Sequence, residues 1–243
     1  MKETFADKVI KFNKRLEYKG ELPNGFQVLN PYLDNLETTA VMQQFYQKYY
    51  NDSLKRKFII GINPGRHGAG VTGIPFTDTK RLQSVCAIEM KSLHTHEVSS
   101  VFVYDMIATY GGAEKFYKEV YINSLFPLAI IRQAAKDKWV NANYYDDPAL
   151  FEALKDFMIE SLKINIGLGL DTDQVFVLGK KNAVFLQKLN KEAKLFKRLT
   201  ILEHPRYIQQ YKSREKDLYI DKYILALNMP KEKHINFDIE TKS

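Results

Sequence analysis

A glycine-rich segment and two further polar residues stand directly after runs of apolar residues in this chain. The run Phe58–Ile62 leads into Asn63, and five glycines and two prolines lie between residues 61 and 76. Asn123 and His204 each follow another such run. A glycine-rich loop lets the backbone approach a ligand closely, and amide or imidazole groups can hydrogen-bond a water or a substrate atom. These residues therefore predict a pocket for a polar ligand.

Three of the glycines spell G-x-G-x-x-G, the pattern of a dinucleotide-binding loop. The first of them, Gly68, lies six residues beyond the apolar run, and Pro75 follows where the fingerprint requires the start of a helix. The phosphate-loop pattern G-x-x-x-x-G-K-[ST] does not occur in the sequence. The pattern therefore argues against a dinucleotide site, and we expect no cofactor.

The cysteine and histidine content limits metal chemistry. The single cysteine, Cys86, excludes a disulfide framework and an iron–sulfur cluster held by four thiolates of this chain, and it is expected in the core. His94 and His96 are two residues apart, a spacing that suits a strand or a loop. We expect no metal site.

Short apolar runs typical of buried strands alternate along the chain with segments whose apolar residues have helical spacing, and this alternation predicts the fold. Expected strands cover residues 58–62, 101–104, 120–122, 175–178 and 199–202. Expected helices cover residues 5–16, 41–49, 79–91, 127–136, 148–163, 180–192 and 208–227. The pattern favours an α/β protein: a three-layer α/β/α sandwich with a mostly parallel central sheet of about four strands. Ligands of such sheets bind beyond the carboxyl ends of the strands.

The sequence predicts one domain over residues 1–243, with a loosely ordered tail from about residue 231. No window approaches eighteen consecutive apolar residues, and the N-terminus lacks the apolar core and cleavage site of a secretory signal. We therefore expect a cytoplasmic protein that does not enter a membrane. No feature indicates an oligomer, so a monomer is the default.

The positive charge of the chain is concentrated in one segment. Residues 180–216 hold eleven Lys/Arg and three Asp/Glu, a net charge of +8, whereas the remainder holds 25 basic and 26 acidic residues. A basic surface of this kind is typical of proteins that bind the phosphate backbone of nucleic acids. A set of solvated helix surfaces accounts for the same charges, so the composition leaves both interpretations open.

Three motifs resemble one family. The segment Gly61-Ile62-Asn63-Pro64-Gly65, continuing to Thr72-Gly73-Ile74-Pro75-Phe76, resembles the first motif of the single-strand-selective monofunctional uracil-DNA glycosylases, within the uracil-DNA glycosylase superfamily. Tyr121-Ile122-Asn123 ahead of Phe126-Pro127-Leu128 is similar to the central segment of that family, and His204-Pro205 to the start of its final motif. The resemblance spans roughly residues 58–210 and is greatest to the second, bacterial subfamily.

The resemblance implies an enzyme that flips uracil out of DNA and hydrolyses its bond to the sugar, with other deaminated bases as further candidates. In that interpretation Asn63 holds the attacking water, and His204 donates a hydrogen bond to the departing uracil at O2. Backbone amides near Gly65 contact the base. No lysine stands at the position of Asn63, which argues against a Schiff base, so the expected product is an abasic site in an intact strand.

The resemblance also implies how base and DNA are held. Phe76 would stack on the pyrimidine, and Asn123 would recognise its N3 and O4 groups. The family continues its final motif as His-Pro-Ser-Pro-Arg, whereas this chain has Arg206 and Tyr207 after His204-Pro205, so these two residues are candidates for the wedge that enters DNA. The basic segment adds Lys180 and Lys181 as phosphate contacts. The expected partner is uracil-containing DNA, with single strands as the first candidate and duplexes as the second.

Two other functions fit the same residues. A catalytically weak nucleic-acid-binding protein of this fold would keep the pocket without efficient excision, and the altered final motif leaves that alternative open. A hydrolase of free nucleosides or nucleotides would use the pocket but would not need the basic segment.

Overall fold

The computed structural model describes residues 3–229 of the chain, so the predicted tail from residue 231 lies outside the described residues. The described helices are α1 (Phe5–Arg15), α2 (Pro31–Asp34), α3 (Leu36–Tyr49), α4 (Ala69–Thr72), α5 (Thr79–Ser84), α6 (Val98–Tyr110), α7 (Ala113–Glu119), α8 (Pro148–Gly167), α9 (Lys180–Ala193), α10 (Pro205–Tyr211) and α11 (Lys216–Asn228), with a 3₁₀ turn η1 (Ser213–Glu215) before α11. The described strands are β1 (Phe26–Leu29), β2 (Arg56–Gly61), β3 (Val120–Ser124), β4 (Ala129–Ala135), β5 (Lys138–Ala142), β6 (Leu170–Leu178) and β7 (Leu199–Leu202).

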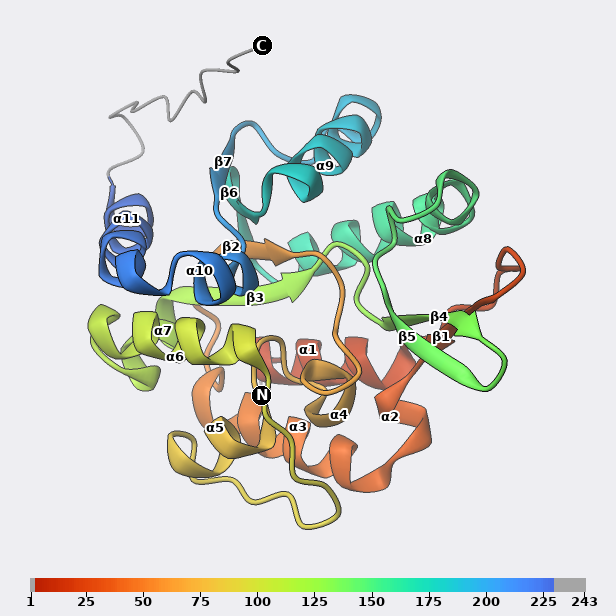
Figure 1. Ribbon diagram of the computed structural model, residues 1–243. Coiled ribbons are helices and arrows are strands. Elements are labelled where there is room, and N and C mark those ends of the chain that lie inside the picture. The colour runs from red at the N-terminus through yellow and green to blue at the C-terminus, as the bar shows by residue number, and fades with distance from the viewer. Residues whose placement is uncertain (1–2, 230–243) are drawn as a thin grey trace.

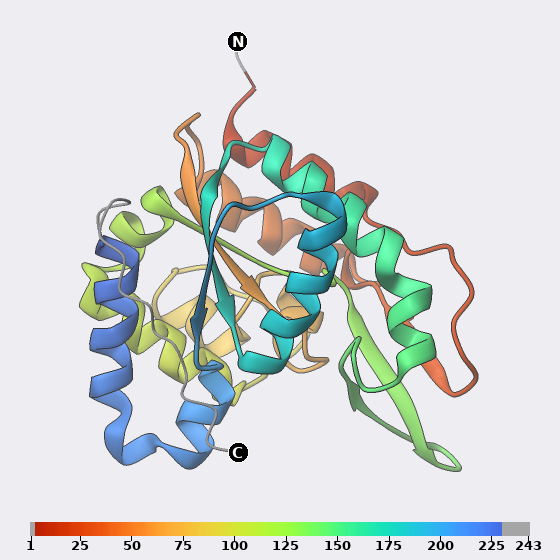
Figure 2. The same cartoon turned by 90° about the horizontal axis from the view of Figure 1, so that it is seen from above.

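The central sheet has four strands in the order β3-β2-β6-β7, and every neighbouring pair is parallel. Helices α8 and α9 cover one face, and α6, α7 and α11 cover the other (Figures 1 and 2). The buried apolar residues of the two faces form one connected core. The predicted α/β class, with helices on both faces of a parallel sheet of about four strands, is therefore confirmed.

A second, antiparallel sheet with the order β1-β4-β5 was not expected from the sequence. Its hairpin, β4 and β5, projects beyond the helices at one side of the molecule (Figure 2). We expected a helix over residues 127–136, but β4 occupies most of that range. Its first three residues are buried and its last four are exposed. Since the apolar positions of so short a segment fit either period, the pairing with β1 and β5 decides its conformation.

Two other elements also differ from the prediction. Residues 101–104, expected as a strand, lie inside α6, which is buried over much of its surface because it packs against both α10 and α11. A helix that is apolar on several sides loses the spacing that distinguishes it from a strand. The single helix expected over residues 208–227 is divided at Lys212 into α10 and α11, and α5 ends at Ser84, well before the predicted Lys91.

The caps of the helices follow ordinary rules of sequence. Thr4 and Asp7 form a capping box at the start of α1, and Asp147 accepts two backbone hydrogen bonds at the start of α8, where Pro148 is the first helical residue. No helix within residues 3–229 is long and apolar enough to cross a membrane. The parallel arrangement brings the segments after β2 and β7 to the same edge of the sheet, where the site is found.

Candidate active site

A cleft of about 470 Å³ opens at the carboxyl edge of the central sheet. Its volume lies in the range of small-ligand sites. Five of the residues predicted from sequence line it, namely Asn63, Gly65, His204, Arg206 and Tyr207. The cleft is built from the loop after β2, the start of α6, the end of β5 with the loop that follows, and α10.

Asn63 is fixed by the backbone on the opposite wall of the cleft. Its amide nitrogen donates to the carbonyl of Ala142 at 3.0 Å, and its oxygen accepts from the backbone N–H of Tyr144 at 3.3 Å. The Tyr144 hydroxyl in turn donates to Asn182 at 2.7 Å, and Asn182 donates to the carbonyl of Ile60 in β2 at 3.2 Å. These hydrogen bonds connect Asn63 back to β2, the strand that precedes it. The side chain can therefore orient a water through the remaining lone pair of its oxygen.

Phe76 lies against the end of β2. A Cβ atom on Gly61 would lie 3.0 Å from the Phe76 ring, so only glycine allows this approach. Phe76 itself has a φ of 53°, a left-handed conformation that costs a non-glycine residue about 1–2 kcal/mol. Its ring centre is 5.9 Å from that of His204. The predicted stacking residue is thus next to the predicted hydrogen-bond donor.

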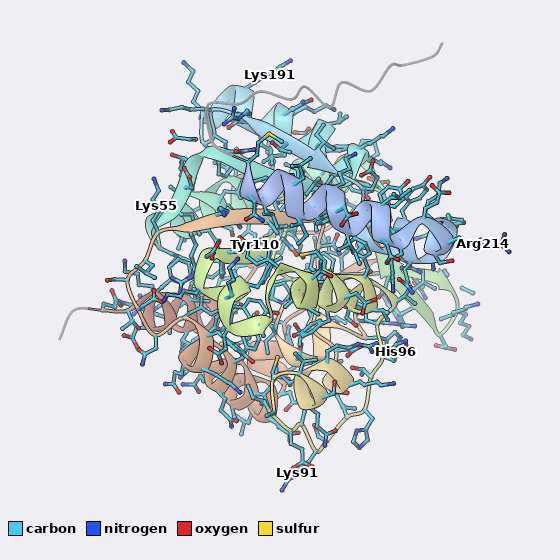
Figure 3. The ribbon with its side chains drawn as sticks, turned by 90° about the vertical axis from the view of Figure 1, so that its left-hand side faces the viewer. Lys55, Lys91, His96, Tyr110, Lys191 and Arg214 are labelled. Atoms are coloured by element: carbon cyan, nitrogen blue, oxygen red, sulfur yellow. The ribbon has the colours of Figure 1, made fainter. Side chains whose placement is uncertain are left out.

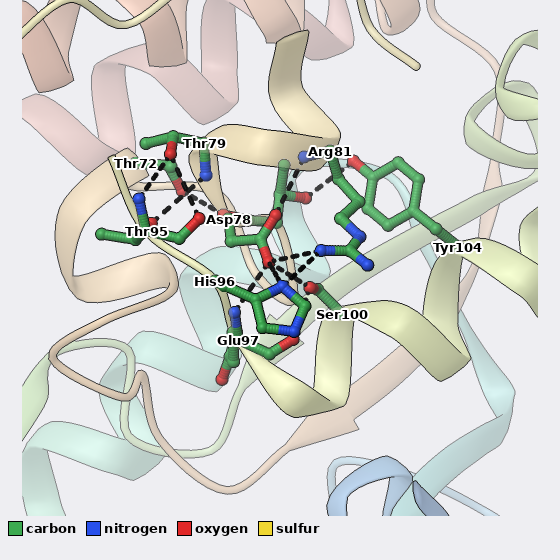
Figure 4. A network of polar contacts seen from close by, with 10 residues as sticks. Thr72, Asp78, Thr79, Arg81, Thr95, His96, Glu97, Ser100 and Tyr104 are labelled. Carbon is green, nitrogen blue, oxygen red and sulfur yellow. Dashed lines mark hydrogen bonds and ion pairs between the residues drawn. The ribbon is translucent and has the colours of Figure 1, made fainter. Parts of the chain in front are cut away.

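The loop that carries Phe76 is held by buried hydroxyl groups. Thr72 donates to the carbonyl of Thr77 at 2.6 Å, and the hydroxyl of Thr77 lies 2.9 Å from that of Tyr104 in α6. Figure 4 shows this region together with Asp78, which caps α5. Since the surrounding bonds fix the loop on both sides of Phe76, they can maintain its strained backbone.

His204 is both a cleft residue and the N-cap of α10. Its Nδ1 accepts the backbone N–H of Arg206 at 3.1 Å, so the proton of the neutral ring lies on Nε2. Burial and the positive charge of Arg206 lower the pKa of His204 to about 4. At neutral pH the ring is therefore an uncharged donor through Nε2–H. The preceding residue, Glu203, is held by α11, where Lys222 forms an ion pair with it at 2.9 Å.

Asn123 is placed differently from the other predicted residues. Its amide nitrogen donates to the Tyr121 hydroxyl at 3.1 Å and to the side-chain oxygen of Asn165 in α8 at 3.0 Å, and its oxygen accepts the N–H of Ser124 at 2.8 Å. Successive side chains of a strand point to opposite faces, so Asn123 faces α8 and the neighbouring residue faces the other way. The structure does not bring Asn123 to the cleft, contrary to our expectation.

Ser124, the next residue of β3, lies on the Phe76 side of the sheet, although neither Ser124 nor Phe76 is among the residues that line the cleft. Ser124 pairs in register with Gly61, and its hydroxyl lies 3.5 Å from the position of a Cβ on Gly61, next to the Phe76 ring. The sequence motif drew attention to the amide of Asn123, but the alternation of β3 decides which residue accompanies Phe76. Pairing Gly61 with Ser124 across the two strands is the signal that could have identified it.

Few basic residues of the segment 180–216 lie near the cleft. Lys181 lies with its Nζ 4.3 Å from the ring centre of Tyr145, a residue that lines the cleft, whereas Lys180 is exposed and does not line it. Lys191 and Arg214, two other basic residues of the segment, lie at separate places on the surface (Figure 3). The charges counted in the sequence are therefore spread over several surfaces.

Two exposed aromatic residues border the cleft on α10. Tyr207 and Tyr211 have 45% and 73% of their surface exposed, and their ring centres are 5.7 Å apart. Tyr211 was not predicted, because its spacing from Tyr207 resembles an ordinary helix face. Two solvent-exposed rings at the mouth of a cleft, next to Arg206, provide surfaces on which bases can stack.

Comparison with known proteins identifies the family of this chain. The model of the uracil DNA glycosylase superfamily matches residues 47–228, which include the cleft and all four strands of the central sheet. The chain belongs to the uracil-DNA glycosylase superfamily. Curated protein sequences give no significant match.

A solved structure agrees with this assignment. The crystal structure of wild-type Pedobacter heparinus SMUG2 is 52% identical in sequence, with a TM-score of 0.90, and the match covers 93% of this chain and 97% of that one. The resemblance to the uracil-DNA glycosylase superfamily inferred from three motifs is confirmed, as is the prediction of a DNA-repair enzyme that hydrolyses N-glycosyl bonds.

Sequence reasoning missed one ionisable residue of the glycosylase cleft. Glu97, the residue before α6, lines the cleft with Asn63 and His204. Burial and the Asp78 carboxylate raise its pKa to about 7, although Arg206 acts in the opposite direction. Only the folded chain brings Glu97 next to the first motif, so no local pattern marks it.

Within residues 3–229, no group of three or more His, Cys, Asp or Glu side chains lies close enough together to bind a metal ion. His96 contacts Arg81 instead, with its Nδ1 2.7 Å from the guanidinium. Cys86 is buried, as expected, and its sulfur lies 3.4 Å from the Tyr104 hydroxyl.

Proposed function

We propose that this member of the superfamily is a monofunctional uracil-DNA glycosylase in which His204 and Asn63 carry the reaction. The observation that supports it most is the state of His204: a neutral ring whose only proton is on the nitrogen free to face a ligand, in the cleft that also contains Asn63. A neutral donor is suited to a leaving group that becomes anionic as its bond to the sugar breaks.

The reaction begins with a uracil held outside the base stack. Phe76 offers its ring to the face of the pyrimidine, and its position 5.9 Å from His204 allows one base to contact both. His204 Nε2–H then donates to uracil O2, where negative charge develops. A preorganised donor of this kind contributes on the order of 10²–10³ in rate.

The attacking water is oriented by Asn63. The amide oxygen of Asn63 already accepts one backbone N–H and has a second lone pair for the water, while its nitrogen is bonded to carbonyl groups of the chain. An amide accepts no proton at physiological pH. Asn63 therefore fixes the position of the water and leaves the proton to another acceptor.

Ser124 is the polar group of β3 that we assign to the base edge. Its hydroxyl is on the Phe76 side of the sheet, whereas the Asn123 amide is fully engaged with Tyr121, Asn165 and the backbone of Ser124. A hydroxyl both donates and accepts, so it can bond to the uracil O4 or N3–H. It discriminates among bases less strictly than a fixed amide does.

The DNA strand passes over α10 and the start of α9. Arg206 and Lys181 neutralise phosphates there, and the Tyr207 and Tyr211 rings stack on bases beside the flipped one. We propose single-stranded DNA as the preferred substrate, because the paired exposed rings suit unpaired bases.

The first test uses a labelled single strand with one uracil and a matching strand with thymine. Cleavage that appears only after alkali, and only at uracil, is the expected result for the wild type. Asn63→Ala and His204→Ala should each lower the single-turnover rate by on the order of 10²–10³ and still bind the strand.

Unchanged rates in either variant would remove that residue from the mechanism. A wild type that binds the strand in a salt-sensitive manner but releases no uracil would instead support the binding protein of the same fold. Thermal unfolding of each variant separates loss of chemistry from loss of structure.

A further inference from the structure

Glu97 has no structural use for its charge. It is the N-cap residue of α6, yet its side chain makes no cap hydrogen bond. Its Oε2 is buried and has no hydrogen-bond partner among the described residues. A buried, unpaired carboxylate is costly, and such groups occur chiefly where a ligand or a reaction needs them.

The carboxylate is aimed at the first motif. Its Oε1 lies 3.5 Å from the position that a Cβ on Gly65 would occupy, and the whole carboxyl group packs against Gly68, where a Cβ would collide with it. The absence of a side chain at Gly68 therefore makes room for this carboxylate. Asn63 and His204 line the same cleft.

Asp78 fixes where α6 begins and hence where Glu97 lies. One of its oxygens accepts the backbone N–H of Glu97 at 2.7 Å and the hydroxyl of Ser100 at 2.7 Å, and it pairs with Arg81 at 3.1 Å. Figure 4 shows Asp78 at the centre of this network, with Glu97 beside it. The main chain of Glu97 is thus held while its side chain remains unbonded.

We propose that Glu97 is the proton acceptor for the water that attacks the sugar. This inference rests on the proposed glycosylase reaction. The bond between C1′ and the base nitrogen breaks with its electron pair leaving on the base, and the water oxygen forms the new bond to C1′. The proton lost by that oxygen passes to the Glu97 carboxylate and then to solvent or the departed base.

The role follows from what the other groups cannot do. Asn63 orients the water but accepts no proton, and His204 Nδ1 is bonded to the Arg206 amide. The negative charge of Glu97 also faces a sugar that becomes positively charged in the transition state. Charged or titratable groups around it come from each neighbouring element: Asp78 and Arg81 at the start of α5, His96 beside it, His67 in the motif loop, and His204 and Arg206 at α10.

The test measures single-turnover uracil release from a single strand between pH 5.5 and 9. Wild-type rates should rise through about pH 7, because Glu97 must be ionised to accept a proton and its pKa is raised to about 7. His204, with its pKa lowered to about 4, should not contribute to this rise. Glu97→Gln should lower the rate by on the order of 10²–10⁴ and abolish the rise.

Three further variants make the result decisive. Glu97→Asp keeps an acceptor and should recover part of the rate with a pH-dependent profile. Gly68→Ala displaces the carboxylate without removing it and should lower the rate in the same direction. Glu89→Gln changes an exposed carboxylate outside the cleft and should behave as wild type.

A Glu97→Gln rate within threefold of wild type, or an unchanged pH profile, would overturn the role of Glu97 while leaving the glycosylase intact. Absence of uracil release by the wild type would instead overturn the proposed function. Should Glu97→Gln unfold, Glu97→Asp and Gly68→Ala decide the question, and normal binding of all variants to a strand with an uncleavable abasic analogue excludes lost affinity as the cause.

Discussion

Individual side chains in the cleft are controlled by the backbone around them. Arg206 N–H sets the proton position of His204, and the amide of Asn63 is bonded to carbonyl and N–H groups of two loops. Sequence identified both residues because their motifs carry the chemistry directly. It also indicated Asn123, for which we propose Ser124 instead, because a motif shows residue types and the strand alternation shows which face each side chain takes.

The different surroundings of Asn123 and Ser124 give a clear prediction. Asn123→Ala should destabilise the protein by about 1–3 kcal/mol, because it leaves buried partners in Tyr121 and Asn165 unsatisfied. Ser124→Ala should leave unfolding nearly unchanged and should alter the ratio of uracil to cytosine excision, because these two bases differ in the N3 and O4/N4 groups that the hydroxyl would contact. Chemical denaturation and single-turnover assays of both variants test this.

The opposite pattern would restore Asn123 as the base contact. A stable Asn123→Ala protein that loses discrimination between uracil and cytosine, with a Ser124→Ala protein like wild type, would be that result.

At the scale of elements, the ends of β2 and β7 and the start of α6 define the site. The sequence predicted the strands at residues 58–62 and 199–202 because these runs are short, apolar and bounded by polar or glycine residues. It failed for α6 and β4, whose conformations depend on burial against other elements. Glu97 was missed together with α6, since the expected strand over 101–104 placed no helix start beside the motif loop.

The contact between β2 and Phe76 can be tested at Gly61. Gly61→Ala puts a Cβ 3.0 Å from the Phe76 ring and 3.5 Å from the Ser124 hydroxyl, so the ring must move. We expect excision to fall by about tenfold or more, as the loss of about 1.4 kcal/mol of stacking would produce. Single-turnover kinetics measure this effect.

Gly167→Ala is the matched control, because a Cβ at Gly167 meets no atom within 4 Å. Equal rates for the two alanine variants would show that the position of Phe76 does not matter for excision.

For the whole molecule, the basic residues counted in residues 180–216 are spread over several surfaces, and Arg206 is the one of them that lines the cleft. The net charge of +7 and its concentration in residues 180–216 were evident from sequence, but the fold carries most of those residues away from the cleft. Residues that are close together in this segment can be far apart in the structure, because the chain reverses direction between α9 and β7. Arg206 lines the cleft, and Lys181 lies next to it, against the ring of Tyr145.

The salt dependence of the affinity for single-stranded DNA should distinguish basic residues near the cleft from those elsewhere. Lys181→Ala and Arg206→Ala should each lower affinity at low salt and reduce the slope of log affinity against log salt by about 0.7, the value for one phosphate contact on a single strand. Lys191→Ala, an exposed change on the distant part of α9, should leave the slope unchanged. Equal effects of all three would indicate diffuse attraction instead of a defined path.

The hydrogen bond from the Arg206 backbone to His204 has an evolutionary consequence. Because a main-chain N–H fixes the tautomer, every residue type except proline at position 206 supplies the same donor. The side chain there can change without moving the proton of the imidazole. This chain, with Arg206 and Tyr207 where the resembled family has serine and proline, thus combines an altered surface with an unaltered tautomer of the histidine.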